Sequence, residues 1–186
     1  MNIVKIIILI VFLGLLLTAC FRPPNYPDTP AIGFESIRNV PISNGNDSVY
    51  ITISYQDGNG DIGLDARAAS DTMPPYQRSL ANGQPNLFFN NYFLNLYKKV
   101  NGRFVKVTFN AGEFSLNARI PPLNPSRNSA IEGTLTYGLQ FFYIFAEAYT
   151  PRISRNDTVK FDVQIADRAL NRSNIIETQE IIVGRR

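Results

Sequence analysis

The chain has 186 residues, of which 45% are hydrophobic and 18% charged, and 18 basic against 15 acidic side chains give a net charge of +3. It contains no histidine and one cysteine, which excludes a Ser-His-Asp triad, a Cys-His pair and an ordinary histidine-ligated zinc or iron site. The basic residues are scattered rather than clustered, so no nucleic-acid partner is expected.

Residues 1–19 are predicted to form a lipoprotein signal peptide. Lys5 precedes the twelve residues 6–17, which lack polar side chains and reach only ~18 Å of a ~30 Å hydrocarbon core. The Leu-Thr-Ala-Cys sequence at 17–20 follows and matches the bacterial lipobox, in which the cysteine thiol accepts the lipid. We expect cleavage before Cys20 and its acylation, palmitate included, which gives lasting membrane attachment. The alternative is a free or buried cysteine after an uncleaved anchor.

Residues 20–32 are predicted to be a tether that follows the lipidated cysteine. Four prolines between positions 21 and 30 forbid a helix and favour an extended path. By resemblance to known lipoprotein sorting signals, Phe21 in place of an aspartate favours the outer membrane, and the lack of a following acidic cluster argues against export to the cell surface. We therefore expect an outer-membrane lipoprotein of the cell envelope, with its domain at 33–186 on the periplasmic face.

Period-two alternation of apolar and polar residues dominates the rest of the chain and predicts an all-β fold. It is clearest in the segments 49–56, 104–109 and 159–166. Asn101-Gly102 predicts a tight hairpin turn between strands at 91–99 and 103–109. Further strands are predicted at 33–40, 113–119, 131–137, 141–149 and 174–183. Seven to nine short strands with Gly, Asn and Pro turns predict an antiparallel β-sandwich.

The segment 66–90 is much longer than an ordinary connection between strands. Such a loop is typically either functional or a solvated insertion, and both interpretations stay open. Tyr76, Leu80 and the apolar run at 87–89 predict that part of it packs against the body. Asp71-Thr72-Met73 resembles the acceptor for O-glycosylation in envelope proteins of Bacteroidota, so Thr72 is a candidate glycosylation site.

A loop rich in oxygen ligands directly follows the predicted strand at 48–56. Glycines between its polar residues let the backbone curl so that several oxygens face one point, and calcium takes six to eight oxygens. The candidate metal ligands are Asp57, Asn59, Asp61 and Asp65. The alternative is an Asx- and Gly-rich turn whose carboxylates cap backbone amides.

This loop resembles the start of an EF-hand or dockerin loop at the first, third and fifth positions. It then departs from that pattern, because Ile62 stands at the position of the turn glycine and Ala68 at that of the bidentate glutamate. An EF-hand is therefore not expected.

The segments 48–65 and 157–183 resemble the B strand with its BC loop and the closing hairpin of PKD, fibronectin type III and other immunoglobulin-like domains. Together they resemble immunoglobulin-like lipoproteins of Bacteroidota. The resemblance implies an immunoglobulin-like β-sandwich without an assigned activity. In that topology the BC and FG loops share one pole, so Asp167 and Asn171 are expected near the first loop as further metal contacts, or else as plain turn residues.

Three functions follow from these features. The first is a non-catalytic, lipid-anchored structural or binding module with calcium at one pole, with another envelope protein or a glycan as partner, and with no catalytic residues. The alternative is a carboxylate-based, glycosidase-like hydrolase of the periplasm or cell surface that uses acids among Asp57, Asp61, Asp65 and Asp167. A third is a small-ligand binder covered by the 66–90 loop.

Overall fold

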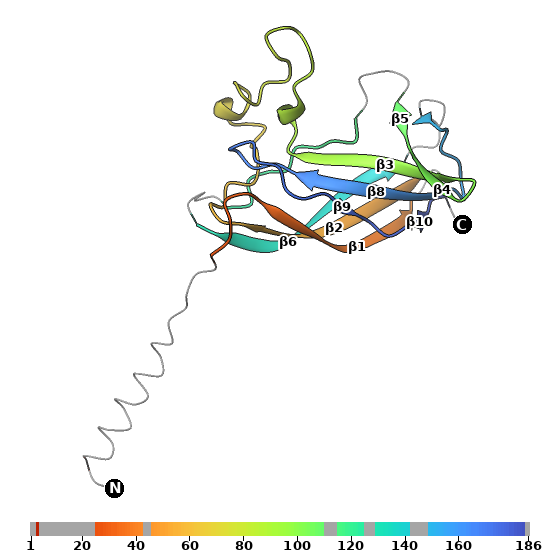
Figure 1. Cartoon of the computed structure of the whole chain (residues 1–186), viewed down its shortest axis with the longest axis horizontal. Helices are drawn as coiled ribbons and strands as arrows, with labels where there is room; N and C mark the ends of the chain where they lie inside the picture. The colour runs from red at the N-terminus through yellow and green to blue at the C-terminus, as the bar shows by residue number, and fades with distance from the viewer. Residues whose placement is uncertain are drawn as a thin grey trace.

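Two antiparallel sheets face each other across an apolar core (Figure 1). The computed structural model describes residues 3, 25–42, 46–109, 115–124, 129–141 and 149–184. The predicted signal peptide and Cys20 lie outside the described residues. Within the described ranges, no helix has the length and apolar character needed to cross a membrane.

The first sheet consists of β1 (Ala31–Pro41), β2 (Asp47–Asp57) and β6 (Ile131–Phe141), in the order β1-β2-β6. The central strand β2 pairs with β6 over its whole length, from Asp47 opposite Phe141 to Asp57 opposite Ile131. Its alternation places every second side chain in the core, where β-branched residues pack well. The predicted strands are therefore confirmed, and β6 is longer than expected.

The second sheet has the order β10-β8-β3-β4, and β9 also pairs with β8. These strands are β3 (Tyr92–Val100), β4 (Arg103–Lys106), β8 (Thr158–Ile165), β9 (Ile176–Glu177) and β10 (Ile181–Ile182). The hairpin turn is confirmed, since Val100 pairs with Arg103 across Asn101 and Gly102, both with positive φ.

The strand order brings two long-separated loops to one end of the sandwich. We letter β1, β2 and β6 as strands A, B and E, and β3, β8 and β9–β10 as strands C, F and G, after the usual lettering of β-sandwiches. The BC loop therefore spans 58–91 and the FG loop spans 166–175. The all-β, sandwich-like fold agrees with the sequence prediction, and this topology places the BC and FG loops side by side (Figure 1).

The predicted strand at 103–109 is divided in two. The predicted alternation of buried and exposed side chains along it is wrong at one position, Val105. β4 pairs with β3, whereas β5 (Thr108–Phe109) pairs with β7 (Tyr149–Thr150). Because the chain changes partner at Val107, that side chain is 3% exposed while Val105 is 43% exposed. Buried and exposed side chains alternate regularly only as long as a strand stays paired with the same neighbouring strand.

The C-terminal strand predicted at 174–183 is also divided, into β9 and β10. Between them the hydroxyl of Thr178 accepts a hydrogen bond from the Phe161 amide, in place of a backbone ladder bond. Among the described residues there are thus ten strands, four of them two residues long, rather than seven to nine. The strand predicted at 113–119 is reduced, in the described part, to a single bridge between Ala118 and Tyr92. Most of the strand predicted at 141–149 lies outside the described ranges.

The described part of the predicted tether is attached to the sandwich. The hydroxyl of Tyr26 donates to Glu132, and the carbonyl of Pro27 accepts from the amide of Gly58 at 2.9 Å. The start of β1 is held as well, since the side-chain amide of Asn174 accepts from the Ile32 amide and donates to the Ile32 carbonyl. β1 begins at Ala31, two residues before the predicted start of the domain.

Candidate metal centre

Three carboxylates, from the end of β2, the BC loop and the FG loop, meet at one point. Asp57 is the last residue of β2, Asp61 lies four residues further on, and Asp167 follows β8. One carboxylate oxygen from each lies within 4.8 Å of the other two. An isolated bridge between Ile62 and Asp167 holds the two loops together. The structure thus places the two loops side by side, as expected from the sequence.

Two oxygens of this cluster are buried without a hydrogen-bond partner. Asp57 is 0% exposed and Asp167 is 3% exposed. One oxygen of Asp57 accepts from the Asp61 amide at 2.9 Å, but its Oδ1 has no partner, and neither has Oδ1 of Asp61. Burying a carboxylate oxygen with no partner is destabilising, and a bound cation would supply the missing interaction.

Burial makes the ionised state of the cluster unfavourable. Burial, together with the negative charges of Asp61 and Asp167, raises the pKa of Asp57 to about 6. Burial also raises the pKa of Asp61 and that of Asp167. Burial and like charges both oppose ionisation, whereas a divalent cation between the carboxylates would reverse the effect.

Two glycines let the backbone of this loop pass close to neighbouring segments. Gly60 has φ +69°, and a Cβ there would lie 2.1 Å from the carbonyl oxygen of Ser129. Gly63 has φ +118°, and a Cβ there would lie 2.3 Å from Pro122 Cα. A side chain at either position would therefore disturb the path that carries Asp57 and Asp61 to the cluster.

Asp65 does not join the cluster of carboxylates. Its carboxylate accepts from the Arg67 amide at 2.8 Å, and its own amide donates to Asp71 at 2.6 Å. The sequence hypothesis placed Asp65 with the metal ligands, whereas the structure turns its side chain to cap the next turn of the chain.

The two predicted asparagine ligands lie beside the cluster and bond to its members. The backbone amide of Asn171 donates to one oxygen of Asp167 at 2.7 Å, and its side-chain amide donates to the other at 2.8 Å. Asn59 Oδ1 lies 3.4 Å from the Asp61 amide. Asn171 therefore orients Asp167, which is the task of an outer-sphere residue in a metal site.

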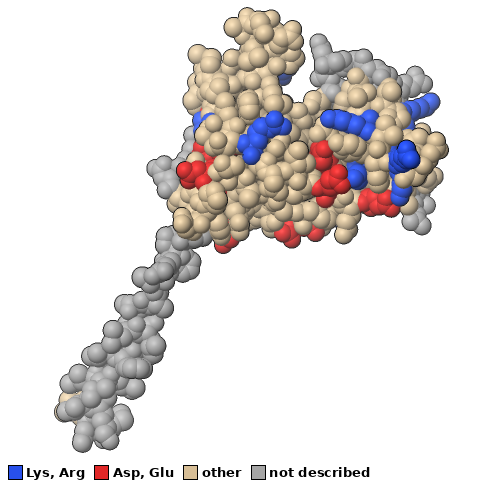
Figure 2. Space-filling view, in the orientation of Figure 1, with Lys and Arg blue, Asp and Glu red and all other residues tan. Residues whose placement is uncertain are grey.

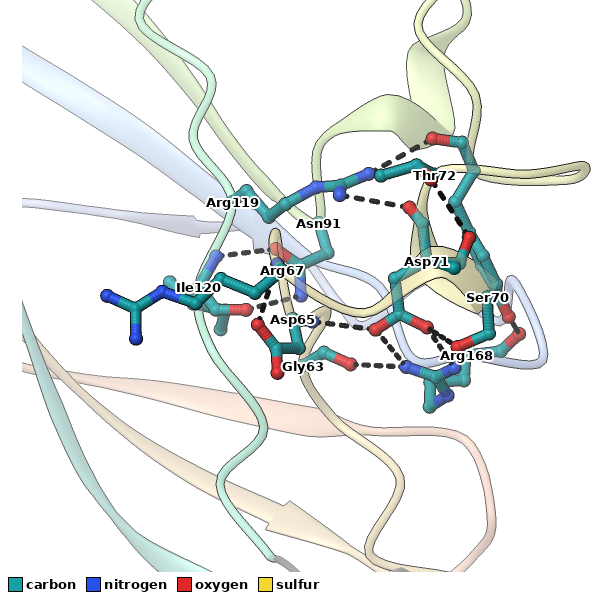
Figure 3. A network of polar contacts seen from close by, with 12 residues as sticks. Gly63, Asp65, Arg67, Ser70, Asp71, Thr72, Asn91, Arg119, Ile120 and Arg168 are labelled. Carbon is teal, nitrogen blue, oxygen red and sulfur yellow. Dashed lines mark hydrogen bonds and ion pairs between the residues drawn. The ribbon is translucent and has the colours of Figure 1, made fainter.

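A buried ion pair adjoins the cluster and was missed from the sequence (Figure 3). Asp71 is fully buried, and both of its oxygens accept from Arg168, at 2.7 and 2.5 Å. The Arg168 guanidinium holds the pKa of Asp71 well below its usual range. The two residues are 97 positions apart, so no local pattern in the sequence indicates the pair.

The segment 66–90, called the arm below, is bound to the body through this pair and through Arg119. The guanidinium of Arg119 donates to three arm carbonyls, namely those of Phe89 at 2.8 Å, Asp71 at 3.0 Å and Tyr76 at 3.0 Å. Figure 3 shows the bond to Asp71. The arm contains two single-turn 3-10 helices, Ala69–Asp71 and Leu87–Phe89. It rises from the sandwich near the start of β3 (Figure 1).

The predicted packing of the arm is confirmed at Tyr76, which is buried, but Leu80 and Leu87 are exposed. Thr72, the candidate glycosylation site, is exposed, and its hydroxyl donates to the Ala69 carbonyl. The face of the arm seen in Figure 2 carries few charged side chains. The base of the arm is therefore polar and fixed, and its outer part is largely uncharged.

The chain matches no protein-family model, no curated protein and no solved structure.

Proposed function

We propose that the chain is a lipid-anchored, non-catalytic module of the bacterial cell envelope that binds calcium at Asp57, Asp61 and Asp167. The observation that supports this proposal is the convergence of three carboxylates whose oxygens lie within 4.8 Å of one another. The unpartnered Oδ1 atoms of Asp57 and Asp61 are a second, independent indication of a missing cation.

The chemistry of the donors favours calcium over a transition metal. All three side chains offer hard carboxylate oxygens, and the chain contains no histidine. Such ligands suit calcium, which completes its six to eight oxygens with backbone carbonyls and water. The ion would cancel the repulsion among the carboxylates and join the BC loop to the FG loop.

A glycosidase-like hydrolase fits the geometry less well. Such an enzyme needs two carboxyls that face each other across a substrate cleft, ~5–10 Å apart, whereas these three carboxylates surround one point. A surface hollow of about 470 Å³ lies elsewhere, along 31–33, 54–56 and 132–134. Glu132 is the one acid among the residues that line it, so this hollow lacks a catalytic pair.

The anchor and the partner belong to the same proposal. Acylation of Cys20 would hold the module at the outer membrane, on its periplasmic face, and the partner would be another envelope protein or a glycan. A rigid sandwich with a fixed arm suits such a binding or structural role, since binding residues commonly lie on loops that a stable scaffold positions.

Isothermal titration calorimetry of the full chain in detergent should show calcium binding that depends on the cluster. Asp57→Asn and Asp61→Asn each remove a charged ligand and should weaken binding by at least ~10-fold. The matched control is Asp65→Asn, in the same loop but outside the cluster, which should leave the affinity nearly unchanged. Equal affinities for wild type and Asp57→Asn would exclude the proposed site.

Lipid attachment should depend on a single residue. Metabolic labelling with palmitate in a bacterial host should label the wild-type protein, and Cys20→Ala should abolish both the label and the association with membranes. Unchanged membrane association of an unlabelled Cys20→Ala chain would show that an uncleaved anchor holds the protein instead.

A further inference from the structure

The FG loop connects the carboxylate cluster directly to the arm. Asp167 belongs to the cluster, and the next residue, Arg168, forms the bidentate ion pair with Asp71 of the arm. The hydroxyl of Tyr76, also in the arm, donates to the backbone carbonyl of Arg168. Adjacent residues of one loop therefore serve the candidate cation site and the arm.

The BC loop makes the same connection from its own side. Asp57 at the end of β2 and Asp61 in this loop belong to the cluster, and a few residues later the amide of Asp65 donates to Asp71 at 2.6 Å. The carbonyl of Gly63 accepts from Arg168 at 3.3 Å (Figure 3). Both loops that supply the cluster therefore meet at the Asp71–Arg168 pair.

Charge links the two sites as well as geometry. The guanidinium of Arg168 is attracted by Asp71 and also by the negative charge of Asp61. Without a cation, the carboxylates of the cluster would compete with Asp71 for the positive charge of Arg168 and so weaken its hold on the arm. A bound divalent cation would neutralise the carboxylates of the cluster, so that Arg168 interacts with Asp71 alone.

We infer that calcium at the carboxylate cluster locks the arm in place, so that the calcium-loaded protein presents the arm in one fixed position. This inference rests on the proposed function, because it uses the same cation site. The arm carries the exposed apolar side chains Met73, Leu80 and Leu87. Calcium thereby controls the position of a largely uncharged projection at the same end of the sandwich as the cluster.

Hydrogen exchange of the full chain in detergent, followed by mass spectrometry, tests the inference. The informative amides lie in 76–90, where Leu80 donates to Gln84 and Asn86 donates to Arg78. If the cluster binds calcium at least ~10-fold more tightly when the arm is docked than when it is released, saturating calcium should slow their exchange by a similar factor relative to EGTA. The hairpin at 97–106 provides an internal control that should exchange equally in both conditions.

Asp71→Asn tests whether the ion pair transmits the effect. In this variant the arm should exchange quickly with and without calcium, while calorimetry should still detect calcium binding, weakened because docking of the arm and calcium affinity are coupled. Glu177→Gln is the matched control, because it removes another ion pair, that with Lys160 at 2.7 Å, which has no contact with the arm. This control should keep the calcium dependence of the wild type.

The outcomes separate the two proposals. Slower exchange of the arm in calcium, lost in Asp71→Asn, supports the lock. Calcium binding with equal arm exchange in calcium and EGTA overturns the lock but leaves the cation site standing. A wild-type chain that binds no calcium overturns both. The comparison of wild-type protein in calcium and EGTA needs no variant, so it holds even if Asp71→Asn fails to fold.

Discussion

Saturating calcium should raise the melting temperature of the full chain by roughly 5–10 °C relative to EGTA. Calcium at about 100 times its dissociation constant adds ~2.7 kcal/mol to the free energy of unfolding, and a domain of this size gains roughly 2–4 °C per kcal/mol. The physical reason is that the folded protein concentrates three carboxylates within 4.8 Å, whereas the unfolded chain separates them. Differential scanning calorimetry in the two conditions measures the effect.

Asp57→Asn provides the decisive control for this shift. The amide removes one negative charge from a buried cluster, so this variant should melt at or above the wild-type temperature in EGTA, and calcium should raise that temperature little. A calcium-dependent rise that survives in Asp57→Asn would place the ion elsewhere on the protein. The absence of any rise in the wild type would assign Asp57 and Asp61 to turn chemistry alone.

Asp71→Asn should lower the free energy of unfolding by about 3 kcal/mol, because it leaves the guanidinium of Arg168 without its carboxylate in a largely buried position. The melting temperature should fall by roughly 6–12 °C, measured in EGTA so that metal binding does not contribute. Glu177→Gln breaks a more exposed pair with Lys160 and should change stability by less than about 1 kcal/mol. If both variants lost the same free energy of unfolding, Asp71 would stabilise the fold no more than an ordinary surface charge does.

The effect of Asp71→Asn should persist across mildly acidic and neutral pH. Arg168 holds the pKa of Asp71 well below its usual value, so the pair contributes fully above the unfolded pKa, near ~3.9. That contribution is lost only as the pH falls below this value toward the folded pKa. The difference in melting temperature between wild type and variant should therefore be the same at pH 5 and pH 8.

The sequence predicted the parts of the fold that local pattern determines. β2 and β8 are flanked by partners on both sides, so their alternation reports the core directly. Alternation was wrong at Val105, where the chain soon leaves one partner strand for another. The Asn101-Gly102 turn was predictable because it needs a positive φ angle at two successive residues, and Asn-Gly is one of the few residue pairs that adopt this readily.

The candidate site was only partly predictable for a related reason. The meeting of Asp57 and Asp61 with Asp167 follows from topology once the two loops are assigned to one pole. The direction of Asp65 depends on Asp71, and Asp71 in turn depends on an arginine 97 positions away. Such long-range pairs leave no periodic trace in the sequence, so only the folded arrangement reveals them.

The attachment of the N-terminal segment has a mechanical consequence. In the proposed lipid-anchored protein, tension applied at the membrane would enter the sandwich where Tyr26 and Pro27 bond to it. It would reach this point before the two hydrogen bonds between Asn174 and Ile32. The residue whose amide donates to the Pro27 carbonyl is Gly58, the immediate neighbour of Asp57. A pull on the proposed anchor would therefore be delivered beside the carboxylate cluster first, and the hydrogen bonds between β1 and β2 would then resist it.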